Sequence, residues 1–226
     1  AFWSLGGLIG SSTGGFLIEH IGVGTHAVLV TLAAAAMIAV AWRIVFRDAP
    51  HPEERAAAAK NGLPLSPLPW LIGIMALFCM VPEGAVLDWG ALYLRNELSA
   101  SVTLSGLAYA AFSLAMAAMR FAGDLIRDRF GAVNTLRVCG VVAILGLLTA
   151  GFAQSASMAI IGFALAGIGI SNLVPIAFSA AGNLPGLASG VGLSVVTTMG
   201  YSGILVAPSA IGFIAEHTGL SRIFIG

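Results

Sequence analysis

Seven long apolar segments constrain what this chain can fold into. They cover residues 3–18, 27–46, 70–94, 105–122, 135–153, 157–181 and 188–215. A helix needs roughly 20 apolar residues to span a bilayer, and most of the segments are near that length. They lack the alternation of half-buried strands and exceed the about 9–11 residues of a barrel strand. The sequence therefore predicts an all-α polytopic membrane protein with about seven transmembrane helices.

Composition excludes most other classes of protein. Only 9% of the 226 residues are charged and 58% are hydrophobic, which is too few charges to cover a soluble domain. Ten basic residues balance ten acidic ones, so nothing indicates a nucleic-acid partner. Cys79 and Cys139 lie in apolar runs, and neither a metal site nor a cofactor is predicted. Gly6, Gly10 and Gly14 recur every four residues and predict a helix-packing face.

The longest polar stretch, 47–69, separates the second and third segments. It holds five of the nine prolines and is predicted to be a linker with a short helix at 53–60. Eight of the ten basic residues lie near this linker or the connection between the fourth and fifth segments: Arg43, Arg47, Arg55, Lys60, Arg120, Arg127, Arg129 and Arg137. An even number of helices separates the two connections, so both lie on one side. The positive-inside rule predicts that this side is the cytoplasm.

A short motif occurs twice in the chain. Residues 15–22 read GFLIEHIG and close the first segment, and residues 212–219 read GFIAEHTG and close the seventh. The two copies lie six helices apart, so their helices run in the same direction. This indicates two parallel halves related by an axis along the membrane normal, which is a known plan among transporters.

The six-helix repeat, the polar linker and the short basic connection together resemble the major facilitator superfamily. The resemblance covers essentially the whole chain and implies an incomplete bundle, from helix 5 to helix 11 and the start of helix 12 of that family. Both ends look like cuts, since the chain begins at Ala1 without Met and stops soon after Ser221. We expect residues 1–46 to end the first half, 47–69 to form the cytoplasmic linker and 70–226 to form the second half.

Residues 123–131, GDLIRDRFG, are similar to the signature cytoplasmic loop of this family. Residues 128–131 match its Asp-Arg-x-Gly core, whereas the leading glycine comes one position early and Ala-Val replaces the basic pair at 132–133. The resemblance implies a gating role for Asp124, Asp128 and Arg129. Arg120 and Asp124 are four residues apart, so they share a helix face and can pair as part of the gate. A structural Arg that reaches for the membrane interface is the alternative for Arg120.

Glu83 is the most informative single residue, because it lies near the middle of the third segment. A carboxylate at the centre of a spanning helix costs about 2.5–3.5 kcal/mol and therefore normally faces a cavity or a partner. We interpret Glu83 as a proton-coupling or substrate-contacting acid, with a structural hydrogen bond to another helix as the alternative. The preceding Pro82 predicts a kink. This segment also resembles a bacterial subgroup that includes fucose-permease-like and YbjJ-like transporters.

Four further residues are candidates for a binding site. Asp88 lies about 140° around the helix from Glu83, where it could face a cavity mouth or pair at a helix interface. Trp89 shares a face with Tyr93, and the pair could stack on a sugar-like ligand or belong to the aromatic belt. Asn172, beside a predicted kink at Pro175, offers an amide to hydroxyl groups or to another helix. Tyr201 is the favoured ligand contact in the seventh segment.

These features favour a secondary active transporter that moves a small solute by alternating access and is coupled to protons. Its expected partners are the solute, protons and the bilayer of the inner or plasma membrane, and we expect it to act as a monomer. The cut chain itself is not expected to transport. The alternatives are a multidrug or metabolite efflux facilitator and a non-transporting membrane sensor or scaffold. An enzyme is not predicted, because the sequence has no HExxH, CxxC or Ser-His-Asp set.

Overall fold

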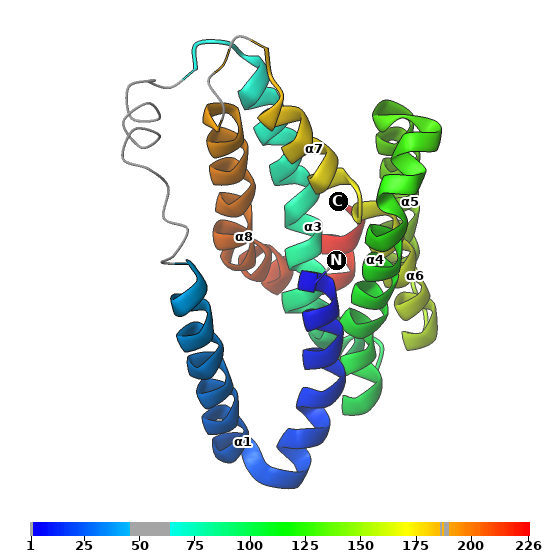
Figure 1. Cartoon of the computed structure of the whole chain (residues 1–226). Coiled ribbons are helices and arrows are strands. Elements are labelled where there is room, and N and C mark those ends of the chain that lie inside the picture. Colours follow the sequence, from blue (N-terminus) through cyan, green and yellow to red (C-terminus); the bar gives the residue numbers. More distant parts are fainter. Residues whose placement is uncertain (1, 46–63, 186, 188–189) are drawn as a thin grey trace.

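The computed structural model describes residues 2–45, 64–185, 187 and 190–226. These residues form helices and no strand (Figure 1). Six stretches of the described residues are long and apolar enough to cross a membrane, and a shorter apolar helix covers Ser4–Ile18. The predicted all-α polytopic bundle is therefore confirmed. The predicted short helix at 53–60 lies outside the described residues.

The helix bounds follow the predicted segments closely. The helices are α1 Phe2–Val45, α3 Leu68–Asn96, α4 Val102–Phe130, α5 Ala132–Gly151, α6 Ala156–Ile170, α7 Leu173–Gly182, α8 Val191–Thr218 and α9 Leu220–Ile225. The main difference is that the helices are longer than the apolar segments and the connections are shorter. The connections predicted at 19–26 and 123–134 are wrong, since both stretches are helical except for one glycine each.

Single glycines make these tight joints. Gly22 divides α1 into two arms, Gly131 joins α4 to α5, and Gly219 joins α8 to α9. Their φ angles are 76°, 78° and 87°, and their ψ angles are 157°, 153° and 156°. Only glycine adopts this conformation readily, because a Cβ would clash with the backbone. A chain that turns within one residue can keep almost all of its length in helices.

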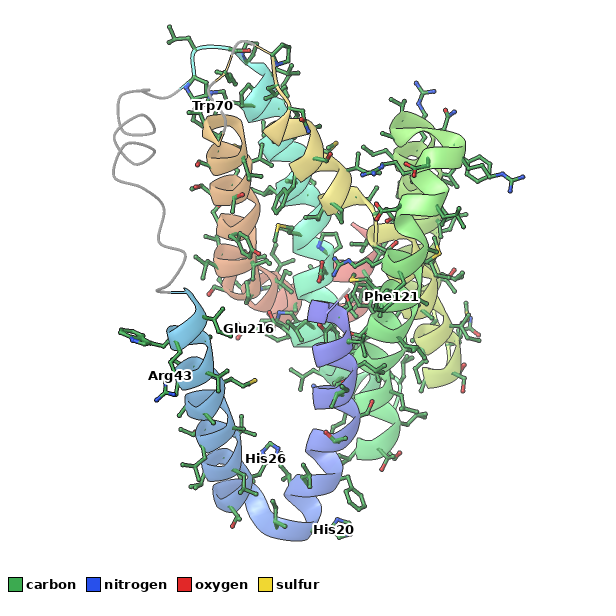
Figure 2. All side chains as sticks on the ribbon, viewed as in Figure 1. His20, His26, Arg43, Trp70, Phe121 and Glu216 are labelled. Atoms are coloured by element: carbon green, nitrogen blue, oxygen red, sulfur yellow. The ribbon has the colours of Figure 1, made fainter. Side chains whose placement is uncertain are left out.

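The two copies of the repeated motif have the same local structure. His20 Nδ1 donates to the Phe16 carbonyl at 2.8 Å, and His217 Nδ1 donates to the Phe213 carbonyl at 2.9 Å. In each copy the two rings also contact, with centroids 4.0 Å and 5.1 Å apart. Figure 2 shows His20 at the turn between the two arms of α1. The matching geometry at both sites supports the parallel repeat.

Figure 1 shows that consecutive long helices alternate in direction. The start of α3, the α4–α5 joint, the end of α7 and the start of α8 lie at one end of the bundle, which we call the linker end. The turn of α1, residues 97–101 and the α8–α9 joint lie at the other, which we call the Gly22 end. The start of α3 and the basic α4–α5 joint therefore share an end, as the count of helices predicts.

The sixth apolar segment is broken into two helices. The helix α6 ends at Ile170 and α7 begins at Leu173, so the break falls at Ser171 and Asn172. Pro175 explains its position, because it has no N–H to donate to the carbonyl four residues earlier, that of Ser171. The predicted kink is therefore confirmed as a local interruption of the helix, in which Ser171 and Asn172 keep right-handed backbone angles. By contrast, α3 continues through Pro82 as one helix.

Three aromatic rings, packed edge-to-face or tilted, fill the core near the Gly22 end. Tyr93 of α3, Phe163 of α6 and Phe224 of α9 have ring centroids between 5.0 and 6.3 Å apart, and we call them the aromatic cluster. The Tyr93 hydroxyl donates to the Ala150 carbonyl of α5 at 2.7 Å. Tyr93 is 1% exposed, so its predicted place in an aromatic belt or on a ligand is wrong.

Backbone contact between α5 and α6 depends on glycine. A Cβ at Gly146 of α5 would collide with the backbone of Ala166, and a Cβ at Gly162 of α6 would lie 2.5 Å from the Ala150 nitrogen. Small residues of this kind let membrane helices approach closely, since lipid supplies no hydrophobic force between them. The glycine content of the chain serves this interface.

The first arm of α1 packs antiparallel to α4, on a different face from the predicted one. A Cβ at Gly7 would lie 2.9 Å from the Tyr109 hydroxyl and 3.2 Å from Ser113 Oγ. The predicted face consists of Gly6, Gly10 and Gly14. A Cβ at any of these glycines would meet no atom within 4 Å, so the prediction that this face packs is wrong for the described residues. Glycine spacing alone identified the helix but not the side that packs.

Candidate functional site

Arg120 of α4 is the centre of a buried polar cluster. Its Nη2 lies 3.5 Å from Glu83 Oε2 of α3, and its Nη1 donates to Ser4 Oγ of α1 at 2.7 Å. Its Nε donates to the Ser171 carbonyl at 3.1 Å. The side chains of Arg120 and Glu83 are 12% and 10% exposed. One guanidinium thus joins α1, α3, α4 and the α6–α7 break, and we call these four residues the Arg120 cluster.

The depth of Arg120 in the bundle explains why it needs these partners. It lies ten residues before Phe130, the last residue of α4, which is about 15 Å along the helix. A charge at that depth is costly unless it is paired and hydrogen-bonded. Grouping Arg120 with the basic residues of the connection was therefore wrong. Its predicted pairing with Asp124 is also wrong, because Asp124 pairs with Arg127 at 3.4 Å.

The interruption between α6 and α7 supplies the third hydrogen-bonding or ionic partner of the Arg120 guanidinium. Because Pro175 cannot donate to the Ser171 carbonyl, that oxygen is free to accept from Arg120 Nε at 3.1 Å. Freed carbonyls at membrane depth are tolerated where a neighbouring side chain satisfies them. Ser171 is fully buried, so the contact excludes water. Pro175 and Arg120, which are far apart in sequence, therefore act on the same carbonyl: Pro175 leaves it free and Arg120 donates to it.

Asn172 lies directly beside the Arg120 cluster. Its side chain rests on Gly123 of α4, where a Cβ would collide with the amide oxygen. Gly123 is one turn beyond Arg120, so both residues face the α6–α7 break. Asn172 is 6% exposed, and its Nδ2 has no hydrogen-bond partner among the described residues. The structure thus brings two predicted site residues, Glu83 and Asn172, to the same place.

The other predicted binding residues lie elsewhere. Asp88 is exposed on α3, Trp89 packs its ring against Gly212 of α8, and Tyr201 of α8 is 51% exposed. The Arg120 guanidinium contacts Glu83, Ser4 and Ser171 rather than any of these three. Tyr109 of α4 lies within electrostatic range of both Glu83 and Asp88. A ligand role for the three stays a prediction.

The predicted gating residues divide into two groups. Arg120 is inside the bundle, whereas Asp124, Asp128 and Arg129 lie in the last turns of α4 at the linker end. Arg127 bridges the two acids, at 3.4 Å from Asp124 and 3.8 Å from Asp128, and both carboxylates are mostly exposed. Exposed pairs of this kind contribute about 0–1 kcal/mol. Their gating role stays a prediction.

Sequence reasoning missed Ser4, Tyr109 and Ser171. For Ser171 the signal was present, because a proline four residues later always frees a carbonyl. The pairing of Arg120 with Glu83 could also have been predicted, since ionisable residues inside a membrane pair with one another. Ser4 carries no comparable signal, because a serine in a glycine-rich helix is equally suited to bonding its own backbone.

Comparison with known proteins decides the family. The sequence profile of the Major Facilitator Superfamily matches residues 1–208. The chain belongs to the major facilitator superfamily. Membrane protein MosC of Rhizobium meliloti is 36% identical over 200 residues, which are 87% of this chain and 48% of that protein. An uncharacterized MFS-type transporter of Yersinia pestis is 39% identical over 153 residues, or 68% of this chain and 40% of that protein.

A third relative extends the similarity along the chain. An uncharacterized transporter of Sinorhizobium fredii is 28% identical over 230 residues, covering 99% of this chain and 59% of that protein. The chain spans about half the length of the curated relatives it matches. As a member of the superfamily it is a multi-pass membrane protein from a family of transporters rather than of enzymes. The narrower resemblance to fucose-permease-like transporters stays a prediction.

The chemistry of the Arg120 cluster follows from its two charged members. A guanidinium stays charged and offers five donors, while a carboxylate can take up or release a proton. Proton exchange at Glu83 would remove or restore the negative charge that lies 3.5 Å from Arg120. The same guanidinium also bonds α1 through Ser4. Protonation of Glu83 on α3 could therefore affect the contact that Arg120 makes with α1.

Proposed function

We propose that this protein is a proton-coupled secondary transporter that moves a small polar solute by alternating access. The observation that carries the proposal is the buried ion pair between Glu83 and Arg120. Ionisable residues inside a membrane mark ion and substrate pathways, because their cost is tolerated only where they act or pair. Membership of the superfamily and the transporter names of two relatives support the transport class.

In the proposed mechanism α1 ends the first half of the transporter and α3–α9 belong to the second half. Arg120 holds the two halves together through Ser4 while Glu83 is charged. When Glu83 binds a proton, Arg120 loses its counter-charge, and polar groups of the solute take over guanidinium donors. The halves then rock about the site and open it to the other side. Asn172 lies close enough to contribute an amide.

The remaining parts of the proposal concern the two ends of the bundle. Asp88, Trp89 and Tyr201 would line the solute path beyond the Arg120 cluster. Asp124, Asp128 and Arg129 would act as a gate at the linker end, which we place in the cytoplasm of a cell whose inner or plasma membrane holds the protein as a monomer. The basic residues of this end support that orientation.

Solute-driven proton flux tests the proposal. The protein, at the length of its relatives, would be placed in liposomes on a pH gradient and offered a panel of sugars and cationic drugs. We expect one solute class to drive proton movement, and Glu83→Gln to lose the proton movement while retaining solute exchange. Glu216→Gln, an exposed acid on α8, is the matched control and should behave as the natural protein does.

Two results would contradict the proposal in different ways. If Glu83→Gln still moves protons with the solute, the coupling site lies elsewhere. If no solute moves in the natural protein although it is folded, the fold serves a sensor or scaffold. A drug in place of a sugar as the moving solute would indicate an efflux protein and would leave the role of Glu83 in place.

A further inference from the structure

A cavity of about 240 Å³ lies between α4 and α5 near the linker end. The two helices are joined at Gly131, and α6 packs against both and contributes to the wall of the cavity. Most lining side chains are apolar, including Phe130 of α4, Val138 and Val142 of α5, and Ile168 of α6. Phe130 and Val138 are 57% and 63% exposed, so the cavity opens on the outer surface of the described bundle.

The surface of this cavity is apolar, and the charge near it comes from arginine. Thr135, in the first turn of α5, borders the cavity but is 3% exposed, and its hydroxyl is buried. The Arg129 guanidinium lies 5.7 Å from the centroid of the Phe130 ring, which also lines the cavity. Arg129 and Arg137 form no ion pair among the described residues, because the nearby acids pair with Arg127. Basic charge at the mouth is therefore not neutralised.

We propose that this cavity binds one acyl chain of an anionic phospholipid. The order of groups along the bundle matches the order of groups in such a lipid. Arg129, beside Phe130 at the end of α4, would bind the phosphate, and the apolar walls would hold the chain. Val142 lies seven residues beyond Thr135, or about 10 Å along α5, which gives the chain a path into the membrane. This inference does not depend on the proposed transport function.

The chemistry favours an anionic lipid over a neutral one. Arginine binds phosphate oxygens through paired donors, and basic residues at the membrane surface attract anionic headgroups. A cavity of about 240 Å³ suits part of one acyl chain rather than a whole lipid.

Native mass spectrometry of the purified chain tests the headgroup. The chain would be exchanged into detergent with equal amounts of phosphatidylglycerol and phosphatidylcholine, and the lipid that stays bound would be counted. We expect one phosphatidylglycerol to be retained in preference to phosphatidylcholine. Arg129→Gln should lower this preference about fivefold, since one basic residue near the surface favours an anionic lipid by about that factor. Arg95→Gln, the same change at the other end of the bundle, should leave it unaltered.

A matched pair of substitutions on α5 tests the cavity itself. Val138→Trp should fill the cavity and abolish retention of both lipids. Val141→Trp places the same ring at an exposed position of the same helix that does not line the cavity, and should retain lipid as before. Circular dichroism would show that both variants are folded. Equal retention by the two variants, or equal retention of the two lipids by the natural chain, would overturn the proposal.

Discussion

The Arg120 cluster and the aromatic cluster differ in what holds their helices together. Both use α3, through Glu83 in one case and Tyr93, ten residues later, in the other. The aromatic cluster joins α3, α6 and α9 through ring contacts and reaches α5 through one neutral hydrogen bond of 2.7 Å. The Arg120 cluster joins α1, α3, α4 and the α6–α7 break through a charge. Only the second contains an ion pair.

A second contact near the aromatic cluster strengthens the contrast. The Glu97 carboxylate accepts from the backbone N–H of Leu220 and, at 3.0 Å, from that of Ser221. It thereby satisfies the first N–H groups of α9, whose helix dipole favours a negative charge. The helices at the Gly22 end are thus fixed to one another by packing and backbone bonds. The comparison shows one end joined through ring packing and bonds to backbone groups, which we call the permanent joint, whereas the Arg120 cluster is the contact that the proposed mechanism releases.

Breaking the charged contact should have the largest effect. Arg120→Leu leaves Glu83 buried beside an apolar group, which we expect to cost about 3–5 kcal/mol of stability and to abolish transport. The double variant Arg120→Leu with Glu83→Leu should recover most of that stability, because no buried charge remains, but should not recover transport. Thermal unfolding in detergent, followed by circular dichroism, measures the first effect and solute uptake the second. Equal losses of stability in the single and double variants would contradict the account.

Crowding the permanent joint should have the next largest effect. Gly146→Leu drives a side chain into the backbone of α6 and should cost about 1–3 kcal/mol. Gly140→Leu, on the same helix, has open space around it and should cost less than about 1 kcal/mol. Unfolding in detergent compares the two directly. If both variants are equally unstable, the α5–α6 contact is looser than the structure shows.

Removing one hydroxyl from the aromatic cluster should have the smallest effect. Tyr93→Phe keeps the ring and loses the bond to the Ala150 carbonyl, for about 0.5–1.5 kcal/mol. The dependence of proton flux on pH should stay as in the natural protein, because no charge changes. In Glu83→Gln, by contrast, the dependence of proton flux on pH should change. A changed pH profile in Tyr93→Phe would mean that the aromatic cluster is not only structural.

The sequence predicted the helices well and their joints poorly, for a physical reason. Apolar length identifies a spanning helix directly, but charges near its end do not show where it stops. Residues 123–130 contain acids and arginines that look like a loop, yet Asp124 and Arg127 pair along a helix that continues to Phe130. Because α4 is longer than its apolar part, Arg120 lies deep rather than at the surface.

The candidate site was predictable in part. Glu83 and Asn172 stood out because polar groups in an apolar helix need partners, and the structure gives both a place beside Arg120. The separation of Asp88 from Glu83 followed from the helix period, but the places of Trp89 and Tyr201 could not be derived, since their direction depends on how helices rotate against one another. The link through Ser4 depends on the packing of α1 on α4, which glycine spacing assigned to the wrong face.

The distance between α1 and α4 tests the central claim most directly. Spin labels at Ile9→Cys and Leu107→Cys, both exposed, would report it by double electron–electron resonance, with Cys79 and Cys139 replaced by Ala. We predict that acid broadens or shifts the distance distribution of the natural protein, and that Glu83→Gln shows the shifted distribution already at neutral pH. If Glu83→Gln and the natural protein give the same distribution at every pH, the Glu83 charge does not control how Arg120 holds α1.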